Sequence, residues 1–420
     1  MSGLRHDRAL FRDPTFVLFF VARSIGTLGG SFAPVALAFS ILHLPHGTPG
    51  LLSIVLACES IPMVAFMLLG GVVADRFPRA AVLRVGLGLS FAAFVLLGAM
   101  ILIGWTPLLA LGAASALSGT GIALIYPALT GLIPEILPPA QLQEGNGILG
   151  IARNAASIVG LVASGAMVAL VGGAWALIVG GSLFAVAGIL TLWLPQGRRQ
   201  PGGLSARGVL GDLRDGWREF VAHEWLWVVV AQWSFLVLFF SAATGVIGPV
   251  LANDELGGAG PWSWILAAEA VGMMLGGLLA MRWRPTRPIL AAVLAGAVAI
   301  PVPFLCLGLG APLVAAIVAM AFSGVSFGIF GVLWPTTMQQ RVAPDALSRV
   351  SSYDALGSLI FQPLGLLIGG PATVVLGART AMTVCGLALV VLCVLPLISR
   401  DVRTVGPGVR TEVLESTDAS

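Results

Sequence analysis

Three carboxylic acids stand within long runs of apolar residues: Glu59, Glu269 and Asp354. A carboxyl group among apolar side chains holds its proton, whereas one that faces an arginine releases it. A group that alternates between these surroundings can load and release a proton, and one proton crossing about 100 mV supplies roughly 2.3 kcal/mol. We therefore interpret the three acids as candidate proton-coupling carboxylates. The alternative is that each acid bonds a neighbouring helix for structural reasons.

Two arginines, Arg23 and Arg153, also stand within apolar runs. A charge at the middle of a membrane helix costs roughly 2.5–3.5 kcal/mol on insertion scales. At helical spacing the face of Arg23 continues through Thr27, and that of Arg153 through Ser157. We expect these four residues to line a cavity, although both arginines can instead reach the lipid headgroups.

Aromatic and polar side chains at helical spacing are further candidates for a cavity lining. Asp354, Ser358 and Gln362 are predicted to share one face of a helix, at positions i, i+4 and i+8. Aromatic contact with an amphipathic ligand is expected from Tyr126, Trp233, Trp334 and Phe327. The competing interpretation of the tryptophans is a belt at the membrane interface.

The elements that must position these residues follow from composition. Of the 420 residues, 58% are apolar and 10% are charged, with a mean hydropathy of +0.99. Soluble domains carry about 25% charged residues. Apolar runs of about 20 residues, long enough to cross roughly 30 Å of hydrocarbon, recur along the chain. They lack the alternation of barrel strands, so the sequence predicts an all-α membrane protein.

Loop residues divide the chain into twelve predicted transmembrane helices, which place both termini on the same side of the membrane. The predicted spans are 15–42, 50–74, 80–103, 107–133, 145–171, 174–194, 224–251, 261–281, 288–309, 312–338, 352–374 and 377–398.

The distribution of arginine supports this topology. All 22 basic residues are arginines, and nineteen of them fall on the side of the termini. Arg379 falls on the opposite side, and Arg23 and Arg153 lie within spans. Positive charge concentrates on the cytoplasmic side of membrane proteins. We therefore expect a multi-pass protein of the bacterial cytoplasmic membrane with both termini in the cytoplasm.

The chain also repeats itself at a spacing of 205 to 210 residues. Leu56-Ala-Cys-Glu59 matches Leu266-Ala-Ala-Glu269, and Tyr126-Pro127 matches Trp334-Pro335. The predicted organisation is a six-helix half at 1–194, a cytoplasmic linker with an interfacial helix at 195–223, a second six-helix half at 224–398, and a cytoplasmic tail at 399–420. Two parallel halves around a shared pathway are typical of secondary transporters that work by alternating access.

Other classes of function find little support. No HExxH, GxSxG or phosphate-loop motif occurs, and the four histidines lie near loops or tails, so an intramembrane enzyme is a remote alternative. The four cysteines stand singly, without the spacing of metal ligands. We expect no cofactor, no metal and no nucleic acid. The expected partners are a small-molecule substrate, protons and the lipid bilayer, with the monomer as the functional unit.

The loop between the second and third predicted spans carries a motif. Gly71-Val-Val-Ala-Asp75-Arg76-Phe-Pro-Arg79 resembles the Gly-x-x-x-Asp-Arg-x-Gly-Arg signature of the major facilitator superfamily. The segments from Tyr126 to Asn146 and from Leu333 to Asp354 are similar to bacterial macrolide-efflux and enterobactin-export proteins of that superfamily. The resemblance implies two pseudo-symmetric six-helix halves and proton-driven export of a drug, a siderophore or another secreted metabolite. Proton-coupled import of a small solute is the alternative.

The resemblance also implies a conformational latch made of Gly71, Asp75, Arg76 and Arg79. Asp75 is expected at the positive N-terminal end of the eleventh span. The two arginines are expected to pair with Glu135 or Glu144 and to hold the outward-facing state. The competing interpretation is a basic loop that only sets the orientation of the chain.

Overall fold

A computed structural model describes residues 10–138, 141–195, 217–283, 285–342 and 344–406 of the chain. The side chains of residues 67–76, 143, 344–346, 348, 349 and 352 lie outside this description. Within the described part, twelve helices are long and apolar enough to cross a membrane, which confirms the predicted number and the all-α fold class.

The described part of the first half contains seven α-helices, because its first span consists of two. Asp13 caps the first of them by accepting a hydrogen bond from the Thr15 N–H at 2.8 Å, directly before Pro14. The helices are α2 (Pro14–Gly30), α3 (Ala33–Leu42), α4 (Pro49–Arg76), α5 (Arg79–Leu102), α6 (Leu108–Ile136), α7 (Leu142–Val171) and α8 (Gly173–Leu190).

The second half repeats this plan with more interruptions. Its first span passes from α-helix into two π-helical segments, which the sequence analysis did not predict. The elements are α10 (Glu224–Ser241), η3 (Ala242–Ile247), α11 (Gly248–Leu251), η4 (Ala252–Leu256), α12 (Ala259–Arg282), α13 (Pro288–Ala299), α14 (Val302–Gly308), α15 (Leu313–Arg341), α16 (Pro344–Leu359), α17 (Gln362–Leu376) and α18 (Ala378–Val394). The short helix α19 (Arg400–Thr404) follows.

The eleventh span is broken, and this corrects one expectation. Helix α16 ends at Leu359 and α17 begins at Gln362. Pro363 has no backbone N–H, and its ring would clash with the carbonyl of Leu359 in a continuous helix. The prediction that Asp354, Ser358 and Gln362 share one continuous helical face is therefore wrong.

Close helix packing in both halves rests on matching glycines. Gly119 of α6 lies against the carbonyl of Glu59 on α4, and Gly324 of α15 lies against the carbonyl of Glu269 on α12. A Cβ at either glycine would clash with that carbonyl oxygen. Helices α6 and α15 both have 29 residues. They begin at Leu108 and Leu313 and end at Ile136 and Arg341, so equivalent residues of the two helices are 205 apart.

This spacing corrects the alignment of the fourth helix of each half. At 205 residues Tyr126 corresponds to Gly331, and Trp334 lies three residues further along α15. The predicted equivalence of Tyr126-Pro127 with Trp334-Pro335 is therefore wrong by nearly one helical turn. The similarity of the two dipeptides suggested the wrong alignment. The glycine contacts that give the correct one cannot be seen in the sequence.

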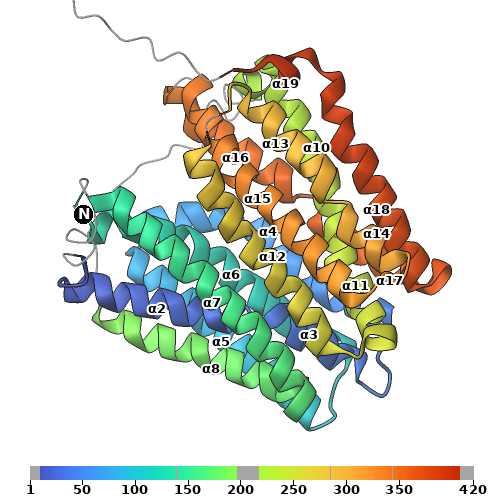
Figure 1. Cartoon of the computed structure of the whole chain (residues 1–420). Coiled ribbons are helices and arrows are strands. Elements are labelled where there is room, and N and C mark those ends of the chain that lie inside the picture. The colour runs from blue at the N-terminus through green and yellow to red at the C-terminus, as the bar shows by residue number, and fades with distance from the viewer. Residues whose placement is uncertain (1–9, 139–140, 196–216, 284, 343, 407–420) are drawn as a thin grey trace, which may run out of the picture.

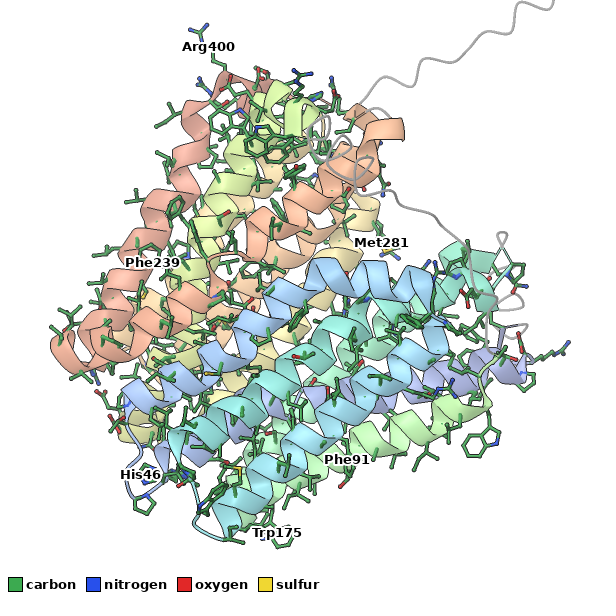
Figure 2. The ribbon with its side chains drawn as sticks, turned by 180° about the vertical axis from the view of Figure 1, so that it is seen from behind. His46, Phe91, Trp175, Phe239, Met281 and Arg400 are labelled. Atoms are coloured by element: carbon green, nitrogen blue, oxygen red, sulfur yellow. The ribbon has the colours of Figure 1, made fainter. Side chains whose placement is uncertain are left out.

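The two halves pack against each other through α4 with α17 and α7 with α12. Hydrogen bonds between them lie at the end opposite the termini: Gly370 N–H donates to Ser53 Oγ at 2.7 Å, and His43 Nε2 lies 3.0 Å from Asn253 Oδ1. Figure 1 shows the helices converging around α3 and α11 and diverging toward the start of α2 and toward α16. Figure 2 shows His46 and Arg400 at opposite ends of the molecule.

The proposed interfacial helix of the linker lies only partly in the described chain. Residues 217–222 are helical, and Trp217 contacts Tyr353 with ring centroids 5.5 Å apart. Residues 196–216 and the tail from 407 onward lie outside the described residues. The domain boundaries at 194, 223 and 398 therefore remain a prediction.

Candidate functional site

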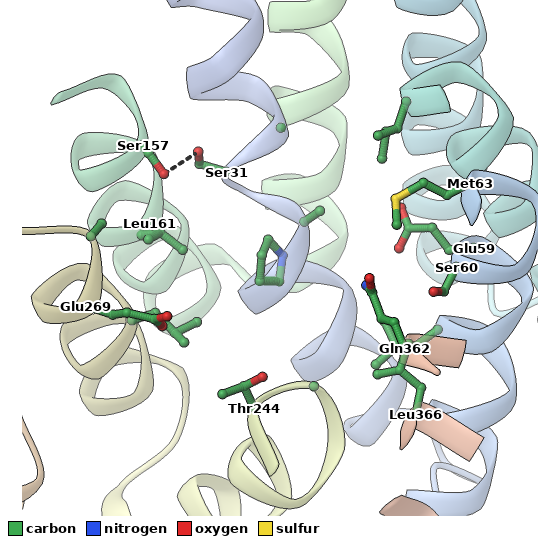
Figure 3. A pocket seen from close by; sticks show the side chains of 18 of the residues that line it. Ser31, Glu59, Ser60, Met63, Ser157, Leu161, Thr244, Glu269, Gln362 and Leu366 are labelled. Carbon is green, nitrogen blue, oxygen red and sulfur yellow. Dashed lines mark hydrogen bonds between the residues drawn. The ribbon is translucent and has the colours of Figure 1, made fainter. Parts of the chain in front are cut away.

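A cavity of about 520 Å³ lies between the two halves. It is lined by α2, α3, α4, α6 and α7 of the first half and by η3, α12 and α17 of the second. Glu59 and Glu269 both line it, and Figure 3 shows them on opposite sides. Two of the three candidate carboxylates thus face one central cavity.

The carboxyl group of Glu59 has a hydrogen-bond donor within the protein. Ser118 Oγ on α6 donates to Glu59 Oε1 at 2.7 Å. Gly119, the next residue, brings α6 against α4 at the same level. Sequence analysis did not single out Ser118, because the contact depends on how the two helices pack.

Glu269 occupies the matching place but lacks the matching bond. The residue that corresponds to Ser118 is Ser323, which directly precedes Gly324. Its hydroxyl is buried and has no hydrogen-bond partner. Among the described residues Glu269 has no hydrogen-bond partner either, and its side chain faces the cavity. The serine and the glutamate are therefore hydrogen-bonded to each other in the first half but not in the second.

Further residues of the cavity were missed by sequence reasoning, although the repeat signals two of them. Met63 and Met273 each follow a cavity carboxylate by four residues, and both line the cavity. Methionine is flexible and polarizable and adapts to irregular apolar ligands. Thr244 lines the cavity from the π-helical η3. Single π-helical turns are frequent at functional sites.

Of the predicted cavity residues, Ser157 and Gln362 lie at the central cavity. Ser31 Oγ donates to Ser157 Oγ at 3.2 Å, which ties α7 to the break between α2 and α3 (Figure 3). Arg153 and Tyr126 are exposed and are not among the residues that line it.

Arg23 and Thr27 line a second cavity of about 280 Å³, within the first half. Its walls come from α2, α5, α6 and α8, and from Thr191 at the end of α8. Gly30 and Ile122 line both this cavity and the central one, so the two cavities adjoin.

A third cavity, of about 220 Å³, holds the rest of the predicted set: Asp354, Ser358, Trp233 and Trp334. Trp334 Nε1 lies 3.2 Å from each carboxylate oxygen of Asp354. Phe330 stacks on both tryptophans, with ring centroids 4.2 Å from Trp233 and 5.5 Å from Trp334. The structure therefore separates Asp354 from Glu59 and Glu269. Phe327 packs edge-on against Trp233 at 5.6 Å.

One residue of the predicted latch is described with its side chain. Arg79 Nη1 lies 3.3 Å from Glu135 Oε1 and donates to the Gly131 carbonyl at 2.5 Å. Both partners belong to α6 of the same half, so this ion pair does not itself join the two halves. The side chains of Gly71, Asp75 and Arg76 lie outside the described residues, and their role stays a prediction.

Twelve membrane-spanning helices in two repeated halves around a central cavity define a secondary transporter. The family comparison agrees, since residues 15–365 match the Major Facilitator Superfamily. The chain belongs to this superfamily, and it is a multi-pass membrane transporter rather than an enzyme.

Curated relatives cover most of the chain at low identity. The uncharacterized MFS-type transporter YfiS of Bacillus subtilis is 23% identical over 94% of this chain and 96% of its own length. The multidrug efflux pump Tap of Mycobacterium tuberculosis is 28% identical over 91% and 92%. The enterobactin exporter EntS of Shigella boydii is 24% identical over 87% and 89%.

Solved structures share the fold at still lower identity. The nucleoside transporter NupG has a TM-score of 0.75 at 14% identity, over 92% of this chain and 98% of its own. A bacterial homologue of the lysosomal transporter Spinster, described as inward-facing and unoccupied, has a TM-score of 0.66 at 17% identity, over 94% and 97%. At these identities the likeness shows the fold alone.

Proposed function

We propose that this protein is a proton-coupled exporter of a small amphipathic molecule, such as a drug, a siderophore or a secreted metabolite. It works as a monomer in the bacterial cytoplasmic membrane, by alternating access, with both termini in the cytoplasm. The observation that carries the proposal is the pair Glu59 and Glu269, which face one central cavity from matching positions of the two halves.

The difference between the two acids supports proton coupling. Glu59 is held by Ser118, whereas Glu269 points into the cavity and leaves Ser323 without a partner. A carboxyl group that moves between a cavity position and a serine-bound position changes its solvation, and with solvation its hold on a proton. Export results if the proton enters the cavity from the side of the membrane opposite the termini while the substrate leaves toward that side.

The direction of transport is supported by two relatives. EntS is named as an enterobactin exporter and Tap as a multidrug efflux pump, and both align over most of this chain. The orientation is supported by the arginines, which concentrate on the side of the termini. In that orientation the two halves are hydrogen-bonded at the outer end, and we propose that the observed state is the one that accepts substrate from the cytoplasm.

The test is transport by the purified protein in vesicles, with ethidium and 1-naphthoate as probes. We expect uptake of a probe into inside-out oriented vesicles under a proton gradient directed outward from the lumen, and a loss of uptake when the gradient is reversed. Glu59→Gln and Glu269→Gln should each abolish the dependence on the gradient. Asp401→Asn, an exposed acid on α19, is the matched control. Gradient-dependent transport that survives in both glutamate variants would refute the proposed coupling.

A further inference from the structure

Arg23 is half-buried in the wall of the second cavity, and one of its guanidinium nitrogens lacks the partner that a buried donor requires. Its Nη1 atom is inaccessible and makes no hydrogen bond. Arginines within membrane spans normally pair with acids or with backbone carbonyls, because an unpaired buried donor is costly. Snorkelling does not explain this arginine, since snorkelling would carry the guanidinium nitrogens to the headgroups rather than bury one of them.

A second arginine near Arg23 makes the electrostatics of this site still less favourable without a bound ligand. The described titratable side chains close enough to act on Arg23 are Arg153, which is positively charged, and Tyr126, whose phenol is neutral near pH 7. Neither arginine makes an ion pair with a described residue. Two like charges repel more strongly near a medium of low dielectric constant than in water. An anion bound at Arg23 would offset this repulsion.

The rest of the cavity fits the body of an amphipathic ligand. Its walls are mainly apolar and include Phe19, Phe94 and Phe184. Thr27 is a polar neighbour one turn from Arg23, and about 280 Å³ of space lies between them and the aromatic side chains. Apolar pockets with a few convergent polar groups are typical of small-molecule sites. Through Gly30 and Ile122 this pocket adjoins the central cavity.

We infer that the second cavity binds the anionic end of a small amphipathic molecule, with a carboxylate or similar oxyanion on Arg23 and an apolar or aromatic body against the phenylalanines. The planar guanidinium suits a carboxylate, which it can bind through two parallel hydrogen bonds. Arg153 is exposed and does not line this cavity, but its charge adds to the positive potential near Arg23. The inference names a substrate class for the proposed exporter and in that respect rests on the proposed function.

Such an anion can be free in solution or can be the phosphate of a lipid. We commit to the free molecule, because the pocket adjoins the central cavity at Gly30 and Ile122 and the Nη1 atom of Arg23 is buried. A lipid-binding site would instead be saturated by anionic lipid. The experiment therefore compares nanodiscs of phosphatidylcholine with nanodiscs that also contain phosphatidylglycerol.

The test is equilibrium binding of radiolabelled 1-naphthoate to the full-length protein in phosphatidylcholine nanodiscs, with neutral 1-naphthamide as the competitor of the same shape. Binding needs no proton gradient, so it can succeed even if the proposed coupling fails. We expect saturable binding of 1-naphthoate, little competition by 1-naphthamide, and at least a tenfold weaker affinity in Arg23→Gln, since a hydrogen-bonded charge is lost. Arg282→Gln, an exposed arginine at the end of α12, should bind like the unchanged protein.

A second variant guards against misfolding of Arg23→Gln. Arg153→Glu changes an exposed side chain and supplies Arg23 with an internal anion, so we expect it to block 1-naphthoate while Arg23 is still present. Three results would each overturn the inference. Arg23→Gln could bind 1-naphthoate as tightly as the unchanged protein, 1-naphthamide could compete as strongly as unlabelled 1-naphthoate, or phosphatidylglycerol could displace the probe completely. The last result would assign the arginines to a lipid headgroup.

Discussion

The contact between α4 and α17 allows a quantitative test of alternating access. Gly370 lies where the two halves meet, and a Cβ added there would be 2.5 Å from Ser53 Oγ and 2.6 Å from the carbonyl oxygen of Pro49. Ordinary contacts between such atoms are about 3.5 Å, so Gly370→Ala must push the helices apart by roughly 1 Å. Overpacking of this kind costs about 1–3 kcal/mol. The cost falls on the observed state, in which this end is closed.

A destabilisation of about 1–3 kcal/mol changes the ratio of two states roughly 5- to 150-fold. Ser263 is buried where α12 meets α7, and we expect it to become accessible when that end opens. In a variant with the four native cysteines replaced by alanine, labelling of Ser263→Cys by a soluble maleimide reports the minor open state. We expect Gly370→Ala to raise the labelling rate roughly 5- to 150-fold if the observed state predominates.

The matched control is Gly150→Ala, because a Cβ at Gly150 meets no atom within 4 Å. This control should leave the labelling of Ser263→Cys unchanged. Tyr126→Cys, which is 59% exposed toward the side of the termini, should be labelled more slowly in Gly370→Ala once the alternate state predominates. An unchanged rate at Ser263→Cys in a folded Gly370→Ala protein would refute the idea that this contact holds the observed state.

Three further outcomes follow from contacts described above. Ser118→Ala removes the donor to Glu59 and should lower the free energy of unfolding by about 1–3 kcal/mol, measured by thermal unfolding in detergent. Ser323→Ala removes a hydroxyl without a partner, so it should leave unfolding nearly unchanged but slow proton-driven transport if Glu269 visits this serine during the cycle. Arg79→Gln should cost up to about 1 kcal/mol, and a double-mutant cycle with Glu135→Gln should separate the share of their partly exposed ion pair from that of the hydrogen bond to the Gly131 carbonyl.

Much of the fold is predictable from the sequence, because the membrane imposes length and polarity on every span. All twelve described spans overlap the predicted ranges. The π-helical turns of the seventh span could not be predicted, since they depend on packing rather than on apolar length. The break in the eleventh span was visible in principle, because Pro363 cannot continue a helix that includes Leu359.

Residues of the site were predictable only where the residue type itself was unusual for its surroundings. Charged residues within apolar runs drew attention to Glu59, Glu269 and Arg23, and each of them lines a cavity. Ser118 and Ser323 were missed because serine is common in membrane helices and its importance lies in what it contacts. The recurring Ser-Gly pair at a spacing of 205 residues could have revealed them, since the glycine sets the approach of the neighbouring helix.

The break at residues 360 and 361 has a mechanical consequence. Helix α16 is tied to its own half, where Ser234 donates to the carbonyl of Gly357. Helix α17 is also tied to its own half, where Ser241 donates to the carbonyl of Gln362, and in addition its Gly370 donates to Ser53 of the other half. The eleventh span is thus two helices that share a short joint, and the second of them is hydrogen-bonded both to its own half and to the other half. The second half need not move as one rigid block, because the joint allows α17 to change its tilt relative to α16 when its contact with α4 opens.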